Sequence, residues 1–571
     1  MYGGRAQQKK KMSEKNNLSA IEKIKTASKG LRGTIKESLQ DELTGAIRED
    51  DQALIKFHGM YQQDDRDRRD ERAAKKLDRL YSFMIRLRLP GGAISADKWI
   101  AVNEIAHEHS TGVIKITTRQ TIQLHGIIKS HIKPTIQSFN KAHLDSVATC
   151  GDINRNVTCA SHPAQSPLHA EIFSYASKIS ELLFPKTRAY YEIWIDDEKI
   201  AEADDMSAVV ETDPLYQDRY LPRKLKIGIG IPPNNEVDVL INDIALIAIE
   251  ENGQLKGFNI AAGGGLSATH GNAATYPRLA TVLGFADTEE KVLKTVYEIV
   301  TVQRDFGNRS DRKLARLKYT IDHLGVEKYK AEVEKRTGFK LEPAKAFTFT
   351  ERKDYFGWHK GRNGLWYYTL FVENGRVLDD EKVAMKTAIL EIAKTNKCSF
   401  LFTSSQNIII ADVNDADKNA IDALLQHFKL DAHTEAASSI RKNSIACVAL
   451  PTCPLALAEA QRYLPHLLDK VEPLVTKHGL ENEDIILRMT GCPNGCGRST
   501  VAEIGLIGTA PGKYNLHLGG DHEGQRLNKI YKENAGEADI LSTLDELFSR
   551  FSAERNPDER FGDFAIRKQL V

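Results

Sequence analysis

The chain has 571 residues, too many for one ordinary hydrophobic core, and this length predicts about three or four structural units. Its 79 basic and 78 acidic side chains nearly cancel, and aromatic residues make up only 7% of it, so no nucleic-acid partner is expected. No uninterrupted apolar stretch approaches the roughly 18 residues that would suggest a membrane span, so no membrane association is expected.

The N-terminus and the cysteines together indicate a cytoplasmic protein. Residues 1–15 are basic but are followed by no apolar segment and no small-residue cleavage site, so we expect no secretory signal. An odd number of cysteines argues against a disulfide framework and favours reduced thiols or thiolate ligands. The seven are Cys150, Cys159, Cys398, Cys447, Cys453, Cys492 and Cys496.

The first 80 residues form a charged N-terminal segment. Residues 64–72 (DDRDRRDER) fit a solvated helical face, and docking of a partner protein is the alternative. A strand is expected at residues 83–89, because an apolar block ends there at Pro90-Gly91-Gly92, a strong turn signal.

An internal repeat organises the rest of the chain. Each copy reads as strand, turn, helix and a strand-turn-strand; the elements are expected at residues 84–89, 96–107 and 113–128, and again at 367–372, 382–395 and 399–413. A weaker duplication follows, in which residues 224–231 lead to Gly263-Gly264-Gly265 and residues 485–489 lead to a cysteine motif and Gly519-Gly520. The pattern predicts two related α+β halves about a pseudo-twofold axis, with a ligand between them.

Four cysteines cluster late in the chain as Cys447-x5-Cys453 and Cys492-Pro493-Asn494-Gly495-Cys496. Two short-spaced pairs on two loops can supply four thiolates to an iron-sulfur cluster. Two other interpretations remain at this stage: a zinc site, although the spacers are at or beyond the edge of common zinc spacings, and structural or disulfide-bonded cysteines.

Several basic clusters lie where a multiply charged anion could bind. They are Arg86 with Arg88, Lys115 with Arg119, Asn154-Arg155-Asn156 and Arg223-Lys224-Leu225-Lys226. Each cluster alone also fits ordinary surface charge. The alternation of Lys224 and Lys226 places both ammonium groups on one face of a strand, which favours a common ligand.

The cysteine motif, extended to residues 490–498 (TGCPNGCGR), closely resembles the signature of the nitrite and sulfite reductases that couple a 4Fe-4S cluster to sirohaem. The resemblance covers residues 31–566. It implies that Cys447, Cys453, Cys492 and Cys496 bind one 4Fe-4S cluster and that Cys496 also bridges to the sirohaem iron. It also implies a three-lobed α+β fold with the cofactors at the interface between the duplicated halves.

The family's organisation implies five segments in this chain. After residues 1–80, a possible docking segment, they are a ferredoxin-like half-domain at 81–148, a sirohaem and substrate domain at 149–345, a second ferredoxin-like half-domain at 346–430, and a cluster and sirohaem domain at 431–571.

The resemblance also assigns roles within the basic clusters. Arg86, Arg155, Lys224 and Lys226 match the family's residues that bind sulfite and assist the departure of its oxygens as water. The positions implied to contact sirohaem are Lys115, Arg119, Gln123, His125, Gly263, Gly264, Gly265, Arg309 and Asn494. Without the resemblance, Gly263–Gly265 would fit a flexible loop, and Arg309 would fit a helix cap or a pair with Asp311.

The activity implied by the resemblance is the six-electron reduction of sulfite to sulfide in sulfate assimilation and cysteine biosynthesis. Residues 57–67 and Leu89-Pro90-Gly91-Gly92 resemble subunits that receive electrons from an NADPH-dependent diflavin (FAD/FMN) partner, and a ferredoxin-dependent enzyme is the alternative. Nitrite reduction at the same kind of centre, an electron carrier and a zinc-stabilised scaffold are the other functions considered.

Overall fold

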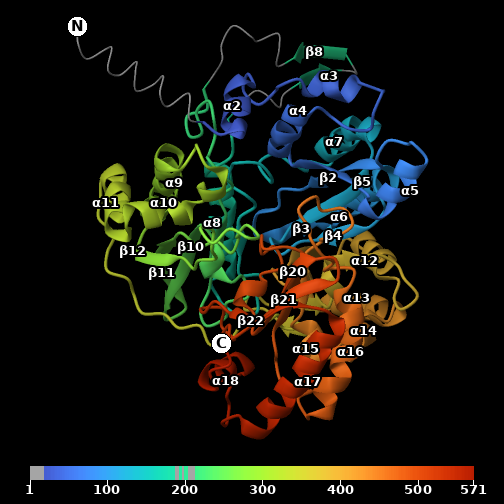
Figure 1. The fold of residues 1–571 in the computed structure, drawn as a ribbon, viewed down its shortest axis with the longest axis vertical. Coiled ribbons are helices and arrows are strands. Elements are labelled where there is room, and N and C mark those ends of the chain that lie inside the picture. Colours follow the sequence, from blue (N-terminus) through green and yellow to red (C-terminus); the bar gives the residue numbers. More distant parts are fainter. Residues whose placement is uncertain (1–17, 187–191, 196–197, 203–211) are drawn as a thin grey trace.

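A computed structural model of the chain describes residues 18–186, 192–195, 198–202 and 212–571 (Figure 1). The first 17 residues of the predicted docking segment are therefore outside the described residues. The rest of that segment contains the helices α2 (Ala20–Ala27), α3 (Ile35–Gln40), α4 (Glu49–Leu54) and α5 (Arg69–Ala74). α5 has no buried residue, as expected of a solvated face, but Asp64 belongs to the preceding strand and not to the helix.

The first copy of the repeat builds a five-stranded sheet in the order β1-β2-β5-β4-β15. Its strands are β1 (Met60–Asp64), β2 (Tyr81–Arg86), β5 (Ile122–Ile127), β4 (Ile114–Ile116) and β15 (Arg376–Val377), and the copy also contributes the helices α6 (Ala96–His109) and α7 (Ile132–Lys141). The expected order of strand, helix and two strands is confirmed, because β2, α6, β4 and β5 occur in that order.

The second copy builds a matching sheet in the order β13-β14-β17-β16-β3. Its elements are β13 (Gly357–Lys360), β14 (Trp366–Leu370), β17 (Ile408–Val413), β16 (Ser399–Phe402) and β3 (Ala93–Ser95), with α12 (Met385–Lys394), α13 (Asp415–His427) and α14 (Leu430–Ala436). The two copies thus have the same sheet topology.

The two copies exchange their edge strands. β3 follows β2 in the chain but pairs with β16 of the second sheet, and β15 follows β14 but pairs with β4 of the first. Both sheets also share one hydrophobic core, in which the fully buried Trp99 ring lies 5.4 Å from the Phe400 ring and 6.0 Å from the Phe402 ring. Because this core crosses the expected boundaries, the five-segment division stays a prediction.

Two further sheets repeat the weaker duplication. One has the order β12-β11-β10-β9-β6, and the other has the order β18-β19-β20-β21-β22. When the strands of each sheet are taken in chain order, the first two pairings are parallel and the last two are antiparallel. The strands are β6 (Thr158–Cys159), β9 (Ile227–Gly230), β10 (Ile244–Glu251), β11 (Gln254–Ala262), β12 (Thr281–Ala286), β18 (Ile445–Ala446), β19 (Leu487–Thr490), β20 (Ile504–Ala510), β21 (Lys513–Leu518) and β22 (Lys529–Ala535).

Helices and a separate core accompany each of these sheets. The first has α8 (His169–Leu182), α9 (Glu289–Phe306), α10 (Leu317–Leu324) and α11 (Val326–Thr337); the second has α15 (Ser439–Lys442), α16 (Leu464–Lys477), α17 (Glu537–Glu554) and α18 (Phe561–Arg567). With the core of the paired sheets, three large cores result, and the duplicated, three-lobed α+β fold is confirmed (Figure 1). A two-stranded ribbon, β7 (Glu192–Ile195) and β8 (Glu198–Glu202), is separate.

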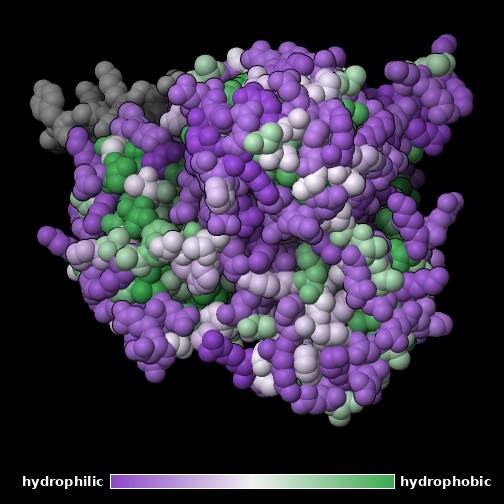
Figure 2. Space-filling model, turned by 90° about the horizontal axis from the view of Figure 1, so that it is seen from below, coloured by the Kyte–Doolittle hydropathy of each residue, from purple (hydrophilic) through white to green (hydrophobic). Residues whose placement is uncertain are grey.

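The surface is largely hydrophilic, with hydrophobic residues in smaller patches on the face seen in Figure 2. Within the described part of the chain, no helix is both long enough and apolar enough to cross a bilayer.

Candidate active site

The four late cysteines occupy loops at one edge of the β18–β22 sheet. Cys447 directly follows β18, and Cys492 comes two residues after β19. Because β18 and β19 are adjacent and parallel, their carboxyl ends meet at the same edge and bring these cysteines together. The Gly491 N–H donates to Cys447 Sγ at 3.3 Å, which ties the two loops. The loop after Cys447 continues to Cys453, whose N–H donates to the Ala449 carbonyl at 3.0 Å.

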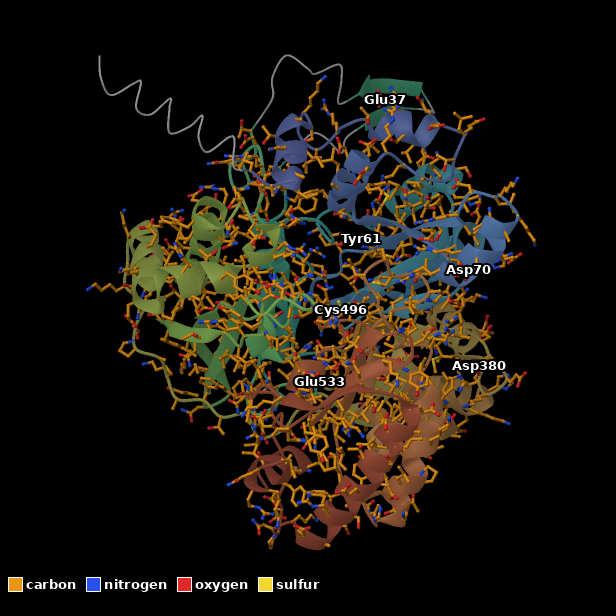
Figure 3. The ribbon with its side chains drawn as sticks, viewed as in Figure 1. Glu37, Tyr61, Asp70, Asp380, Cys496 and Glu533 are labelled. Atoms are coloured by element: carbon orange, nitrogen blue, oxygen red, sulfur yellow. The ribbon has the colours of Figure 1, made fainter. Side chains whose placement is uncertain are left out.

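The loop from Cys492 to Cys496 also contacts both other units of the molecule. The Ala268 N–H donates to the Pro493 carbonyl at 2.9 Å, and Thr118 Oγ1 donates to the Cys496 carbonyl at 3.0 Å. Gly495 has φ +67°, and a Cβ there would lie 2.9 Å from Leu266 Cβ, so this position requires glycine. Cys496 therefore lies where three parts of the chain converge, near the middle of the molecule in Figure 3.

The four cysteines are compatible with a metal cluster in their residue type. Burial first, and Cys496 next, raise the pKa of Cys453 to about 11, and the same two causes raise the pKa of Cys447 and of Cys492, so all three stay protonated thiols without a metal. A cationic centre bound to their sulfurs would favour the thiolate form. Among the described residues, no three His, Cys, Asp or Glu side chains are grouped as ligands of a single metal ion.

Lys224 and Lys226 supply positive charge beside Cys496. They precede β9, and the Lys226 N–H donates to Asp243 Oδ2 at 2.8 Å. Burial, then Lys226 and Arg223, hold the pKa of Lys224 well below its usual value, while burial, then Arg119 and Arg316, lower the pKa of Lys226 to about 7. A thiolate at Cys496 would act on both pKa values in the opposite direction. An anion bound here would favour the charged form of both lysines.

Arg86 and Arg155 both donate hydrogen bonds to the loop at residues 149–151, so the two side chains lie next to each other. Arg86 Nη1 and Arg155 Nη1 each donate to the Thr149 carbonyl at 3.2 Å, and Arg155 Nη2 donates to the Gly151 carbonyl at 3.0 Å. Arg119, which donates to Asn242 Oδ1 at 2.8 Å, is close enough that burial, then Arg155, lower its pKa to about 9. These guanidinium groups form a compact cationic site.

The remaining predicted residues of the first sheet line the same region. Gln123 lies directly opposite Arg86 in the β2–β5 pairing and opposite Lys115 in the β4–β5 pairing. Burial, then Arg376, lower the pKa of Lys115 to about 8. Burial, then Lys115 and Arg86, hold the pKa of His125 far below its usual value, so its ring is neutral. A carboxylate-rich cofactor would stabilise the charged form of Lys115.

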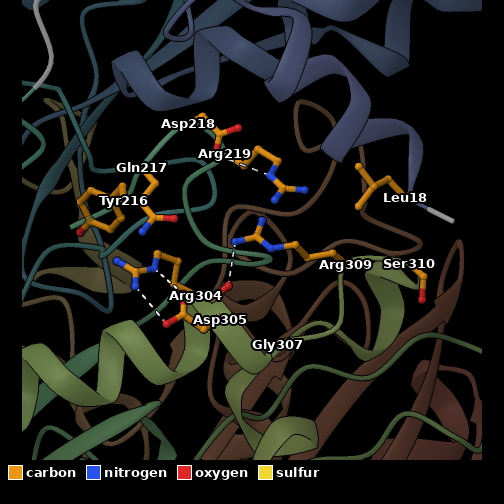
Figure 4. Close-up of a pocket in the computed structure, with 10 residues that line it drawn as sticks. All are labelled: Leu18, Tyr216, Gln217, Asp218, Arg219, Arg304, Asp305, Gly307, Arg309 and Ser310. Carbon is orange, nitrogen blue, oxygen red and sulfur yellow. Dashed lines mark hydrogen bonds and ion pairs between the residues drawn. The ribbon is translucent and has the colours of Figure 1, made fainter. Parts of the chain in front are cut away.

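Two predicted cofactor contacts have other partners in the structure. Gly263, Gly264 and Gly265 donate their N–H groups to the carbonyls of Asp243, Asn242 and Arg278, so this loop is not an open cradle of N–H donors. Arg309 donates to Glu22 Oε2 at 2.6 Å and to the Tyr220 carbonyl at 2.7 Å, and it lines a cavity of about 540 Å³ (Figure 4). Cofactor contact by these residues stays a prediction. Asn494, by contrast, is within the cysteine loop, and its Nδ2 donates to Cys492 Sγ at 3.4 Å.

Sequence reasoning missed two long-range ion pairs beside these residues. Arg316 makes a bidentate pair with Asp243, at 2.8 and 3.1 Å, directly behind Lys226. Arg312 makes another with Asp152, at 2.6 and 2.9 Å, three residues before Arg155. Their partners are 73 and 160 residues away in the chain, so no local pattern marks them.

Comparison with known proteins identifies the family. Residues 174–341 match the nitrite and sulphite reductase 4Fe-4S domain, and residues 75–142 and 359–428 match the nitrite/sulfite reductase ferredoxin-like half domain. The chain belongs to the nitrite and sulfite reductase family. This membership agrees with the duplicated sheets.

Relatives match over nearly the whole chain. A "Sulfite reductase [NADPH] hemoprotein beta-component" of Leptospira biflexa is 61% identical over 97% of this chain and 99% of that protein. A protein of the same name from Anoxybacillus flavithermus is 51% identical over 97% and 96%. The solved structure of the Mycobacterium tuberculosis NirA protein covers 97% of this chain and 98% of its own, with a TM-score of 0.76 and 24% identity, which supports the fold.

Proposed function

We propose that this protein reduces sulfite to hydrogen sulfide, using sirohaem and one 4Fe-4S cluster, as the haem-carrying component of an assimilatory, NADPH-dependent sulfite reductase. The observation that carries the proposal is the four-cysteine motif, whose loop contacts both the unit that carries Lys224 and Lys226 and the unit that carries Arg86. The names of its relatives, 48–61% identical in sequence, agree with this activity.

Cys447, Cys453, Cys492 and Cys496 would hold the cluster, and Cys496 would also hold the sirohaem beside it. Lys115, Arg119 and Asn494 would contact the macrocycle and its carboxylates. When bound, these cofactors would pass six electrons from the donor protein to sulfite and supply the metal centre at which it is reduced, and the protein supplies binding, orientation and charge.

The chain's own residues would hold the substrate and supply protons. Sulfite carries two negative charges, and the cations of Arg86, Arg155, Lys224 and Lys226 can bind its oxygens. The three oxygens must leave as water, which requires protons. Lys226, whose pKa burial and its arginine neighbours lower to about 7, can donate a proton near neutral pH. The cations also stabilise negative charge on a departing oxygen.

A separate diflavin protein is the proposed electron donor. The relatives are named as beta-components of NADPH-dependent enzymes, which implies a second component that takes electrons from NADPH. We also propose a cytoplasmic location, because all seven cysteines are unpaired, as suits a reducing compartment.

The first experiment is to purify the protein from cells that make sirohaem, record its visible spectrum, and assay sulfite and nitrite with reduced methyl viologen. Sirohaem absorption and turnover of sulfite in preference to nitrite are expected. Cys447→Ser should remove the cluster signal, whereas Cys398→Ser, in a cysteine outside the motif, should keep it. Lys224→Met should lower kcat/KM for sulfite, and Lys335→Met, with a side chain 78% exposed, should not.

Other outcomes would redirect the proposal. A protein without sirohaem would contradict it, and a much higher activity with nitrite would transfer the function to nitrite reduction. A purified diflavin reductase with NADPH should replace methyl viologen in the assay. If only reduced ferredoxin can do so, the proposed donor is wrong.

A further inference from the structure

Four polar side chains form a line across one face of the first sheet. Gln63 is on β1, Arg86 on β2, and Gln123 and His125 on β5, and these three strands are neighbours. Gln63 and His125 are 6% and 4% exposed, so water does not satisfy their polar groups freely. Gln63 belongs to none of the clusters that the sequence predicts to bind sulfite or a cofactor.

Hydrogen bonds connect the four residues one after another, from Gln63 through His125 and Gln123 to Arg86. His125 Nδ1 lies 3.0 Å from Gln63 Oε1, and His125 Nε2 lies 3.1 Å from the amide end of Gln123. With its oxygen toward Arg86, Gln123 accepts from Arg86 Nε at 2.9 Å and from Nη2, and its amide nitrogen donates to His125 Nε2 at 3.1 Å. The opposite orientation would set the amide N–H groups against the guanidinium N–H groups, which have no lone pair to accept them.

Only one assignment of donors and acceptors satisfies every hydrogen bond in this line. Because the His125 ring is neutral, it carries one N–H and one acceptor nitrogen. The Gln63 oxygen only accepts, so it requires the proton on Nδ1 and leaves Nε2 to accept from Gln123. The amide of Gln123 then must present its oxygen to Arg86. The oxygen of Gln63 and the guanidinium of Arg86 thereby favour the same orientation of the Gln123 amide.

The same bonds decide what Arg86 can offer an anion. A guanidinium group has five N–H donors. Arg86 Nη1 faces the Thr149 carbonyl at 3.2 Å and Cys150 Sγ at 3.1 Å, and Gln123 accepts from Nε and Nη2. One N–H on Nη2 remains for a ligand, in a direction fixed by these contacts. A reversed Gln123 amide would push the guanidinium from this position.

We propose that Gln63 is a positioning residue, which orients the Arg86 guanidinium toward sulfite through His125 and Gln123. This inference rests on the proposed function, because it takes sulfite as the anion that Arg86 binds. If Gln63 loses its acceptor oxygen, the His125 proton can move to Nε2, the Gln123 amide can turn, and Arg86 meets N–H donors in place of an acceptor.

The test compares Gln63→Met with Gln62→Met in the holoenzyme. Gln62 is the adjacent residue on β1 and loses a comparable bond, the one its Oε1 accepts from the Ile47 N–H at 2.7 Å, but it belongs to no line that reaches Arg86. For Gln63→Met, we expect the sulfite KM, and the sulfite Kd from titration of the visible spectrum, to rise about tenfold, as for a weakened charged hydrogen bond. The kcat and sirohaem content should match those of Gln62→Met.

Two further variants make the outcome decisive. Gln63→Glu keeps an acceptor oxygen at the same length, but its charge favours the doubly protonated His125 ring, whose Nε2–H opposes the Gln123 N–H, so sulfite binding should stay weak at neutral pH. Gln63→Asn moves the oxygen out of reach with little loss of volume, and it should weaken sulfite binding even if the methionine variant fails to fold. Equal sulfite Kd values for Gln63→Asn and Gln62→Met would overturn the inference. A wild-type protein that does not reduce sulfite would instead overturn the proposed function.

Discussion

Asp238 is the buried carboxylate at which the two halves of the molecule meet. It precedes the short 3-10 helix η5 (Val239–Ile241) with φ +47°, and Arg498 precedes its counterpart η8 (Ser499–Val501) with φ +58°. These equivalent residues contact each other at 2.7 Å, and Asp238 also binds Arg352 at 2.7 Å and Arg488 at 2.6 Å. Burial opposes ionisation, but Arg488, Arg352 and Arg498 outweigh it and hold the pKa of Asp238 low.

Replacing this carboxylate should therefore destabilise the fold strongly. Asp238→Asn would leave three buried guanidinium groups without a countercharge, and we expect a loss of about 3–5 kcal/mol in the free energy of unfolding. Asp415→Asn is the matched control, because Asp415 is 70% exposed and its pair with Lys360 is screened by water, so its loss should change stability little. Denaturant unfolding followed by circular dichroism measures both. Equal losses would show that the Asp238 cluster adds no stability.

Whether a single residue's role can be predicted from the sequence depends on how far along the chain its contact partners lie. The two cysteine pairs and the Lys224-Leu225-Lys226 alternation could be predicted because each pattern lies within a few neighbouring residues. Asp238 could not, because Arg488 is 250 residues away and the equivalence of η5 and η8 becomes visible only in space. Gln63 was missed for the same reason, since its role depends on side chains brought next to it by strand pairing.

The exchanged strands β3 and β15 hold the ferredoxin-like halves together. Each follows a tight turn with two positive φ values, Gly91 and Gly92 in the first copy and Asn374 and Gly375 in the second. The sequence predicted both turns from Pro90-Gly91-Gly92 and Asn374-Gly375. It could not predict the exchange, because β3 pairs with a strand some 300 residues later and periodicity carries no information on pairing partners.

Gly92→Ala should disturb this exchange. A Cβ at Gly92, where φ is +80°, would lie 2.9 Å from the Phe402 carbonyl oxygen and 2.8 Å from Gln120 Cβ, so both strain and a backbone clash are expected. Gly364 has a similar φ of +83° with nothing within 4 Å, so Gly364→Ala isolates the cost of conformation, about 1 kcal/mol. We expect the Gly92 variant to lose at least about 2 kcal/mol more in thermal unfolding. A loss no greater than that of Gly364→Ala would contradict a tight fit at β3.

Partly buried histidines with lowered pKa values make the molecule sensitive to acid. Burial lowers the pKa values of His58, His169 and His517 to about 4, against about 6.5 in an unfolded chain. Between these values the unfolded chain binds protons that the folded chain does not, so stability falls as pH falls from about 6.5 to about 4. At pH 5 each histidine should cost about 2 kcal/mol.

Thermal unfolding between about pH 7.5 and pH 5 tests this linkage. We expect the melting temperature to fall steadily below about pH 6.5, and His517→Gln to reduce that slope, because glutamine cannot take up the proton. His270→Gln, in an exposed histidine, should leave the slope unchanged. The ionised carboxylates of Asp152 and Asp238, held by their arginines, lose their contribution only at lower pH and so do not account for this window. A wild-type melting temperature constant between pH 6.5 and 5 would therefore mean that these histidines become protonated in the folded state.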